Sequence, residues 1–387
     1  MTMQKVFKRA FTVALTLGIL AGCASEEDTN QMAPLPVVEN TIASQQVWSQ
    51  TIGDGVEGYF SRLSPAIGYG KIFAADRNGL VKALDPENGK VIWQQDLQGD
   101  VTAKLAGGIT LSYGKLFIGT ENADVIALDE ETGEEIWRTK VEGEVLAKPL
   151  VDNGMVVVNT SRGVLQALDA ETGEAKWQLS SEVPTLTLRG DSSPVAISGG
   201  IFWGQANGRL AGALMNTGQM LWQQPIGSPK GATEIDRLVD VDATPVIAGE
   251  RLYALGYNGA LVSIELRSGQ VAWKRAYSSA TDFAIDGSQL YLVTDKDHIV
   301  AVDTRSGTEL WQNKDLEYRL LSAPALISGY LVLGDSEGYL HWLDPYTGDF
   351  VAQQATDGSG FAIPPIALDD GYLVVTRDGK INKMQMP

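Results

Sequence analysis

Cys23 is the only cysteine in this chain, and it stands where a bacterial lipoprotein is cleaved and acylated. Three basic residues within positions 5–9 precede an uncharged, mostly apolar run from Ala10 to Leu20. That run has the length of a signal-peptide core and is too short to span a bilayer. The segment Leu20-Ala21-Gly22-Cys23 then brings small residues up to the thiol, which is the nucleophile that accepts a diacylglyceryl group. We therefore predict a cleaved signal peptide over residues 1–22 and lipidation at Cys23.

The residues that follow Cys23 indicate where such a lipoprotein would reside. Ala24 and Ser25 come next, with no Asp beside the cysteine, and the usual enteric sorting rule sends such a lipoprotein to the outer membrane, facing the periplasm. Several acyl chains anchor a protein stably where one chain does not. Residues 25–34 are polar and poor in apolar side chains, so we predict a lipidated flexible tether over residues 23–42.

The charge of the chain excludes two classes of partner. Residues 1–22 carry three positive charges and no acid, so their removal takes the formal net charge from −18 to −21. Such an acidic protein is unsuited to nucleic acid, and no basic patch would hold it on anionic head groups. Membrane attachment is therefore expected through the lipid anchor only. With its one thiol acylated, the chain forms no disulfide.

No catalytic or metal-binding constellation can be assembled from the remaining side chains. The two histidines, His298 and His341, are far apart in sequence and lack the spacing of a zinc site. Asp236, Asp240 and Asp242 lie close together, but they do not resemble a compact calcium loop. We expect no enzymatic activity, no metal and no cofactor.

A repeat beyond the tether indicates the fold. The pattern Ala-Leu-Asp-x-x-x-Gly-x-x-x-Trp first occurs over residues 83–93 and returns, with variations, six more times. The glycines of successive copies are 44, 40, 45, 51, 38 and 41 residues apart, a period typical of a β-propeller with one four-stranded blade per copy. The Asp and Gly suit a tight turn between the third and fourth strands, and the Trp suits packing between blades. The last copy has Ala352 in place of the Trp.

The ends of the chain indicate how many blades there are. Residues 372–383 supply strands for a further blade without a fourth strand, whereas residues 45–50 form an orphan strand with Trp48 at the repeat position. Joining the two gives an all-β, eight-bladed propeller of four-stranded antiparallel blades over residues 43–387, with its last blade closed by the N- and C-terminal strands. A seven-bladed ring is the alternative.

Two long inter-blade loops are the candidate binding sites. The longest glycine spacing, of 51 residues, brackets residues 225–245. The 45-residue spacing that precedes it contains residues 183–194. Inserted loops on a rigid scaffold commonly carry binding residues. Leu186, Leu188 and Arg189 place two apolar side chains beside a guanidinium, as in a protein-binding hot spot. The alternative is that the leucines begin the next blade and that Arg189 pairs locally with Asp240 or Asp242.

The repeat is similar to that of pyrroloquinoline-quinone (PQQ) dehydrogenase propellers, and the whole chain closely resembles the BamB family. The closer resemblance is carried by the lipobox and by residues 186–190, 233–238 and 334–342. BamB proteins are lipoprotein subunits of the outer-membrane β-barrel assembly (Bam) machinery. The resemblance implies an eight-bladed propeller that binds the periplasmic POTRA domains of the barrel subunit BamA. It implies contact with the other Bam subunits through BamA and assistance to the folding and insertion of outer-membrane proteins.

The same resemblance implies which residues bind the partner. The family's Leu-x-Leu-Arg-Gly segment corresponds to Leu186, Leu188 and Arg189, and its Asp-Val-Asp segment corresponds to Asp240 and Asp242. The aspartates would either hold Arg189 or meet a basic patch on the partner. Two alternatives stay open: a periplasmic chaperone that binds unfolded outer-membrane proteins directly, and a quinoprotein. The quinoproteins of this superfamily use an adjacent cysteine pair, which the mature chain lacks.

Overall fold

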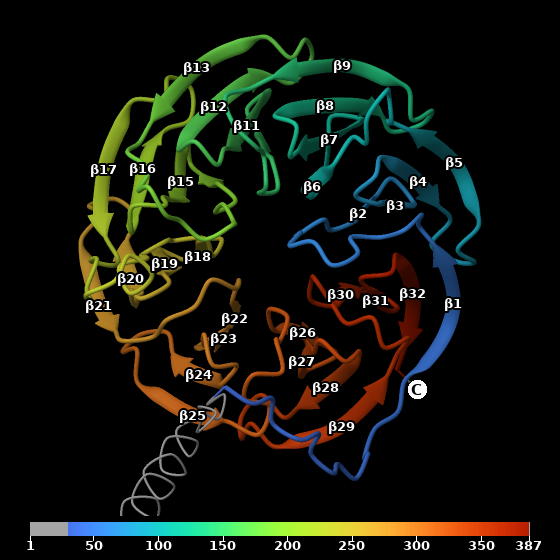
Figure 1. Ribbon diagram of the computed structural model, residues 1–387, viewed down its shortest axis with the longest axis vertical. Coiled ribbons are helices and arrows are strands. Elements are labelled where there is room, and N and C mark those ends of the chain that lie inside the picture. Colours follow the sequence, from blue (N-terminus) through green and yellow to red (C-terminus); the bar gives the residue numbers. More distant parts are fainter. Residues whose placement is uncertain (1–29, 387) are drawn as a thin grey trace, which may run out of the picture.

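The computed structural model describes residues 30–386, and these residues form a closed ring of eight blades around a central axis (Figure 1). Each blade is a four-stranded sheet, and every pair of neighbouring strands within it is antiparallel. The predicted all-β, eight-bladed propeller is confirmed. In this part of the chain there is no helix that is long and apolar enough to cross a membrane.

The strands follow the chain around the ring, from the innermost to the outermost in each blade. Blades 1 to 4 comprise β2 (Ala66–Gly68), β3 (Lys71–Ala75), β4 (Leu80–Leu84) and β5 (Val91–Asp96); β6 (Leu105–Ser112), β7 (Lys115–Thr120), β8 (Asp124–Asp129) and β9 (Glu135–Lys140); β10 (Leu150–Asp152), β11 (Met155–Asn159), β12 (Val164–Asp169) and β13 (Ala175–Ser180); and β14 (Val195–Ile197), β15 (Gly200–Gly204), β16 (Arg209–Leu214) and β17 (Met220–Pro225). Blades 5 to 7 comprise β18 (Val246–Ala248), β19 (Arg251–Leu255), β20 (Leu261–Glu265) and β21 (Val271–Arg275); β22 (Ala284–Asp286), β23 (Gln289–Val293), β24 (Ile299–Asp303) and β25 (Glu309–Asn313); and β26 (Ala325–Ile327), β27 (Tyr330–Gly334), β28 (Tyr339–Leu343) and β29 (Phe350–Ala355).

Blade 8 closes the ring with both ends of the chain. Its three inner strands are β30 (Ile366–Leu368), β31 (Gly371–Val375) and β32 (Lys380–Gln385), and its outermost strand is β1 (Gln45–Thr51) from the N-terminal side. β1 pairs with β32 from Gln45 opposite Gln385 to Thr51 opposite Lys380. The predicted joining of the two terminal segments is confirmed, and it leaves no open seam in the ring.

The repeated tryptophans and glycines hold neighbouring blades together. The Trp137 side chain of blade 2 is 9% exposed, and its Nε1 donates to the Ala170 carbonyl in the turn of blade 3. Gly173 in that turn has φ +74°, and a Cβ added there would lie 2.7 Å from the Trp137 ring. The same contact between one blade's Trp and the next blade's turn glycine recurs from Trp48 to Trp311 around the ring. The glycine is thus required both for its backbone conformation and for the close approach of the indole.

Blade 7 compensates for its missing tryptophan by exchanging two positions. In the other internal blades, the residue paired with the Trp on the third strand is small, as in Ala127 opposite Trp137. In blade 7 the large residue is Trp342 on β28, and the small residue opposite it is Ala352 on β29. Trp342 is 2% exposed and packs edge-on against Tyr372 of blade 8, with ring centroids 5.3 Å apart. The seam between blades 7 and 8 is therefore filled from the neighbouring strand.

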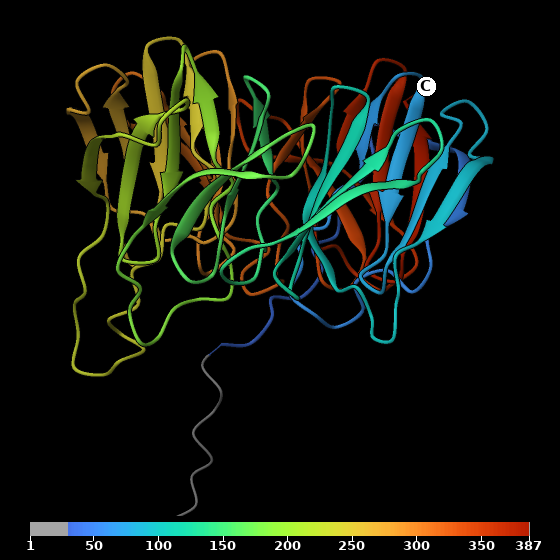
Figure 2. The same cartoon turned by 90° about the horizontal axis from the view of Figure 1, so that it is seen from above.

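The two faces of the ring carry different loops. Because the four strands of a blade alternate in direction, the Asp-x-x-x-Gly turns between third and fourth strands lie on one face. The inter-blade connectors and the hairpins between second and third strands lie on the other, which we name the connector face. The longest connectors project from it, and the described N-terminal segment lies on the same side (Figure 2). In the turns, the aspartates accept backbone N–H groups, as Asp129 does from Glu131 and Thr132, which is a structural role.

The N-terminal residues before β1 run along blade 7 as a strap, defined here as residues 33–42. Ala33 donates to the Glu317 carbonyl and accepts from Arg319, whose side chain is buried. Farther along, the Asn40 side chain donates to the Gln353 carbonyl and accepts from the Gln353 N–H, as a neighbouring strand would. The sequence assigned these residues to the tether of residues 23–42; from Ala33 onward they bond to the propeller. The predicted signal peptide and Cys23 lie outside the described residues.

Candidate functional site

The candidate docking residues lie on two neighbouring connectors. Leu186, Leu188 and Arg189 belong to the connector of residues 181–194 between β13 and β14, and β14 begins only at Val195. The alternative that the leucines start the next blade is therefore wrong. Leu186 is 43% exposed, Leu188 is partly buried, and the Arg189 side chain is 45% exposed. An exposed leucine thus stands beside an accessible guanidinium on the connector face.

Asp240, on the connector of residues 226–245, holds this segment from beneath. Its side chain is 1% exposed, and its Oδ2 accepts the Leu188 backbone N–H at 3.1 Å. Asp242 is 4% exposed and packs against Gly190, where a Cβ would meet its Oδ2 at 2.9 Å. Neither carboxyl is displayed for a partner, and neither forms an ion pair with Arg189. The two aspartates position the backbone of residues 188–190.

Arg189 pairs with two glutamates from other blades. Its Nη2 lies 3.0 Å from Glu121 of blade 2, and its Nη1 lies 3.2 Å from Glu144 on the connector between blades 2 and 3. Glu121 also accepts two hydrogen bonds of 2.8 Å from Arg77 of blade 1, whose guanidinium lies 3.7 Å from the centroid of the Tyr59 ring. The alternative in which Arg189 pairs with Asp240 or Asp242 is therefore wrong, because its ion pairs are with Glu121 and Glu144.

The protonation of Glu121 follows from this network. Burial alone would raise its pKa, but the hydrogen bonds and charge of Arg77, together with the charge of Arg189, lower it. Glu121 is thus an anion held between two guanidinium groups. It fixes the direction of Arg189 while leaving part of that guanidinium open to solvent.

Three carboxyls beneath residues 186–190 have raised pKa values, in contrast to Glu121. Burial raises the pKa of Asp240 to about 6 and that of Asp242 to about 7. Burial and the neighbouring Asp242 also raise the pKa of Asp191 well above its ordinary value. Asp191 Oδ2 and Asp240 Oδ1 are buried and have no hydrogen-bond partner within residues 30–386. No group of acids, histidines or thiols in this range is arranged to hold a metal ion.

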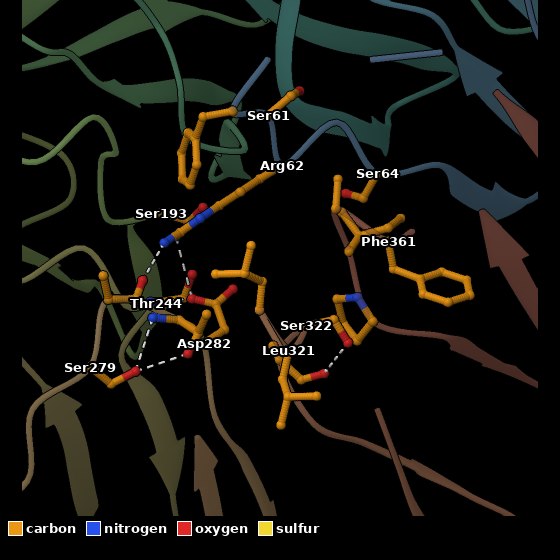
Figure 3. Close-up of a pocket in the computed structure, with 18 of the residues that line it drawn as sticks. Ser61, Arg62, Ser64, Ser193, Thr244, Ser279, Asp282, Leu321, Ser322 and Phe361 are labelled. Carbon is orange, nitrogen blue, oxygen red and sulfur yellow. Dashed lines mark hydrogen bonds and ion pairs between the residues drawn. The ribbon is translucent and has the colours of Figure 1, made fainter. Parts of the chain in front are cut away.

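Arg62 connects the connector of residues 226–245 to the opposite side of the ring. It comes from the connector between β1 and β2 and extends across the axial opening (Figure 3). Its guanidinium donates to the Asp242 carbonyl at 2.9 Å and to the Ala280 carbonyl, and it lies 3.5 Å from Asp282. Asp282 in turn accepts the Thr244 N–H at 2.7 Å. The segment 240–244 is thereby fixed from both sides.

Sequence reasoning did not find Glu121, Glu144, Arg77 or Arg62. A signal for two of them exists in the repeat, because Arg77 and Glu121 both lie three residues before the third strand of their blades, β4 and β8, which are consecutive. Opposite charges at that position in neighbouring copies suggest pairing across a seam. For Arg62 there is no such signal, since it contacts residues about 180 and 218 positions away.

Comparison with known proteins identifies the family. A family model described as outer membrane protein assembly factor BamB matches residues 77–313 and 295–385. A protein of Vibrio cholerae serotype O1 named outer membrane protein assembly factor BamB is 60% identical over 382 residues, which is 99% of each chain. The chain belongs to the BamB family.

Solved structures agree with this membership. The crystal structure of BamB from Moraxella catarrhalis matches with a TM-score of 0.79 and 27% identity, over 89% of this chain and 100% of that one. A quinohemoprotein alcohol dehydrogenase from Pseudomonas putida HK5 matches with a TM-score of 0.70 at 14% identity, over 91% of this chain and 78% of that one, and this likeness concerns the fold alone. The BamB resemblance drawn from the sequence is therefore confirmed over nearly the full length.

Proposed function

We propose that this BamB-family chain is a non-enzymatic scaffold of the outer-membrane β-barrel assembly machinery. It binds the periplasmic POTRA domains of BamA, meets the other Bam subunits through BamA, and assists the folding and insertion of outer-membrane proteins. The observation that carries the proposal is the exposed Leu186 beside Arg189, on a backbone that Asp240 holds from below. A rigid apolar and cationic patch of this kind suits a protein partner.

The arrangement of Arg189 suggests how the partner is recognised. Its guanidinium is aimed by Glu121 and Glu144 and yet stays 45% exposed, so it enters a complex already oriented. A preordered charged side chain loses less entropy on binding than a free one. Leu186 supplies the apolar contact, and the partner provides an acceptor for the remaining donors of Arg189.

The test is a calorimetric titration, in which purified POTRA domains are added to the chain from residue 24 onward. We expect Arg189→Glu to abolish binding, because it places a third carboxylate beside Glu121 and Glu144. Arg189→Met removes the cation without adding an anion, and it should weaken binding at least tenfold. The matched control is Arg305→Glu, which changes an 86% exposed arginine on the opposite face and should bind as the wild type does.

Two results would contradict the scaffold proposal at this site. Equal binding by wild type and Arg189→Glu would remove Arg189 from the interface. Loss of thermal stability in step with loss of binding would assign Arg189 a packing role instead.

We further propose that the protein is held at the outer membrane, on its periplasmic side, by acyl chains on Cys23. The support is the lipobox-like sequence and the membership of a family of outer-membrane assembly factors. Metabolic labelling with a palmitate analogue should mark the wild type, whereas Cys23→Ser should be unlabelled. Labelling of Cys23→Ser would refute the anchor.

Direct binding of unfolded outer-membrane proteins is the alternative function, and one observation favours it. The outermost strands β5, β9, β13, β17, β21 and β25 each end a sheet of the described ring, so their outer backbone groups are available to an added strand. Crosslinking to an unfolded porin in the absence of BamA would support this function. Crosslinking that requires BamA would support the scaffold alone.

A further inference from the structure

A cavity of about 760 Å³ opens at the propeller axis on the connector face (Figure 3). Its wall is built from a repeated position, the residue two places before the innermost strand of a blade. Seven blades contribute this residue to the wall: Ser64, Lys148, Ser193, Thr244, Asp282, Ala323 and Pro364. The volume falls within the range of small-molecule sites. This cavity is separate from the exposed Leu186 and Arg189.

One side of the cavity is apolar. Blades 7 and 8 and the connectors before them contribute Leu321, Phe361 and Ile363, and Phe60 stands at the opening with 46% of its surface exposed. Figure 3 shows Leu321 and Phe361 on the side of the cavity away from Ser193 and Thr244. An apolar part of a ligand would be stabilised against this side, because contact there removes apolar surface from water.

The charged groups of the wall are nearly all paired. Arg62 donates to two backbone carbonyls and lies beside Asp282, and Arg377 donates to the carbonyls of Glu57 and Tyr59. Asp297 accepts the Leu320 and Leu321 N–H groups. Asp295 also lines the cavity but is exposed at its rim. The charges of these groups are therefore already stabilised, by protein partners or, for Asp295, by solvent.

Lys148 differs from the other charged groups. It is partly buried, lines the cavity from blade 3, and its ammonium has no hydrogen bond or ion pair within the part of the chain that the structure describes. Burial lowers its pKa, since water no longer stabilises the cation fully. An anion brought to the ammonium would supply the missing partner.

We propose that the axial cavity binds a carboxylate carried on an apolar body, with the carboxylate paired to Lys148 and the body against the Leu321 and Phe361 side. Two kinds of ligand carry such a carboxylate: a free organic acid, and a peptide whose C-terminus ends in aromatic residues. Cationic ligands are disfavoured because the unpaired, partly buried charge of the wall is positive. This proposal is independent of POTRA binding.

The test uses matched pairs of probes that differ only in charge. Biphenyl-4-acetate is compared with biphenyl-4-acetamide, and an N-acetylated alanyl-phenylalanyl-phenylalanine with its C-terminal amide, by calorimetry with the chain from residue 24 onward. We expect at least one acid to bind tenfold or more tightly than its amide. The pair that shows the preference identifies the source of the carboxylate. Equal binding of acid and amide in both pairs would overturn the proposal.

Variants assign the preference to Lys148. Lys148→Gln should bind acid and amide equally, Lys148→Arg should keep the preference, and Lys230→Gln, at an exposed loop lysine, should match the wild type. A preference that survives in folded Lys148→Gln would also overturn the proposal. A measurement on the wild type alone avoids any folding defect: a saturating acid should raise the Lys148 pKa, followed by NMR of labelled lysine Cε, by about one unit if protonation tightens binding tenfold.

Discussion

Replacing Asp240 with Asn separates two roles of this carboxyl, holding Leu188 and carrying charge. Its Oδ2 accepts the Leu188 N–H at 3.1 Å, and an Asn in the same rotamer keeps an oxygen there. Burial raises the pKa of Asp240 to about 6. A group whose pKa is higher in the folded than in the unfolded state binds more protons when folded, so stability falls as pH rises between the two values.

The magnitude follows from that interval. With an unfolded pKa near 3.8 and a folded pKa of about 6, Asp240 costs roughly 3 kcal/mol of folding free energy once it is fully ionised. Most of that cost, about 2–3 kcal/mol, develops between pH 4 and pH 8. Asp240→Asn cannot ionise, so its free energy of unfolding should decline less than that of the wild type over this range by about the same amount.

The assay is urea unfolding followed by tryptophan fluorescence at pH 4 and pH 8, with POTRA binding measured on the same samples at pH 7.5. Asp240→Asn should bind POTRA domains like the wild type, and Asp240→Ala, which leaves the Leu188 N–H unpaired, should bind more weakly. The control is Asp169→Asn at a turn, where hydrogen bonds from Lys176, Thr172 and Glu171 lower the pKa to about 2. That carboxylate stabilises the fold above pH 4, so its variant should lose stability at pH 8.

Two outcomes would refute the reasoning. A decline from pH 4 to pH 8 as steep in Asp240→Asn as in the wild type would show that Asp240 does not ionise at a raised pKa. Equal loss of binding in folded Asp240→Asn and Asp240→Ala would show that the charge itself meets the partner, and that Asp240 is not a support for Leu188.

Three further predictions concern the scaffold. Arg62→Gln should lower the free energy of unfolding by about 2–3 kcal/mol, because charge-assisted bonds to carbonyls such as that of Asp242 are lost; urea unfolding tests this, and an unchanged midpoint would contradict it. Trp342→Ala should lower the free energy of unfolding by about 3–5 kcal/mol. Adding Ala352→Trp restores the arrangement of the other blades and should recover part of that loss in thermal melts. No recovery would argue that the two positions have not exchanged roles. Gly173→Ala should destabilise by about 1–3 kcal/mol through its positive φ and the contact with the indole, and a neutral result would show that the turn adapts.

Much of the fold could be predicted because the propeller repeats itself. One Asp, one Gly and one Trp at fixed spacing specify a turn and a seam, and they recur once per blade. The orphan strand containing Trp48 lacked only its partner, so the closure with β32 could be inferred. The strap was harder to predict, because residues 33–42 bond mainly through backbone groups and the Asn40 amide, which leave no apolar pattern.

The candidate site was predicted in part. The exposed Leu186 and Arg189 lie on a connector as expected, but the partners of Arg189 depend on which blades the ring brings together. Burial of Asp240 and Asp242 ran against the ordinary expectation that aspartates lie at the surface. Only the path of the connectors shows that the backbone of Leu188 needs an acceptor beneath it.

The strap determines how force from the membrane would reach the propeller. Nine residues separate Cys23 from Ala33, and a fully extended chain of that length spans at most about 35 Å; Ala33 bonds to Glu317 and Arg319. A pull on an anchor at Cys23, as proposed, would be transmitted first to the buried Arg319 and to the connector between blades 6 and 7. The β1–β32 ladder begins at Gln45, twelve residues after Ala33, so a pull on the proposed anchor would reach the strap before it reaches the strands that close the ring.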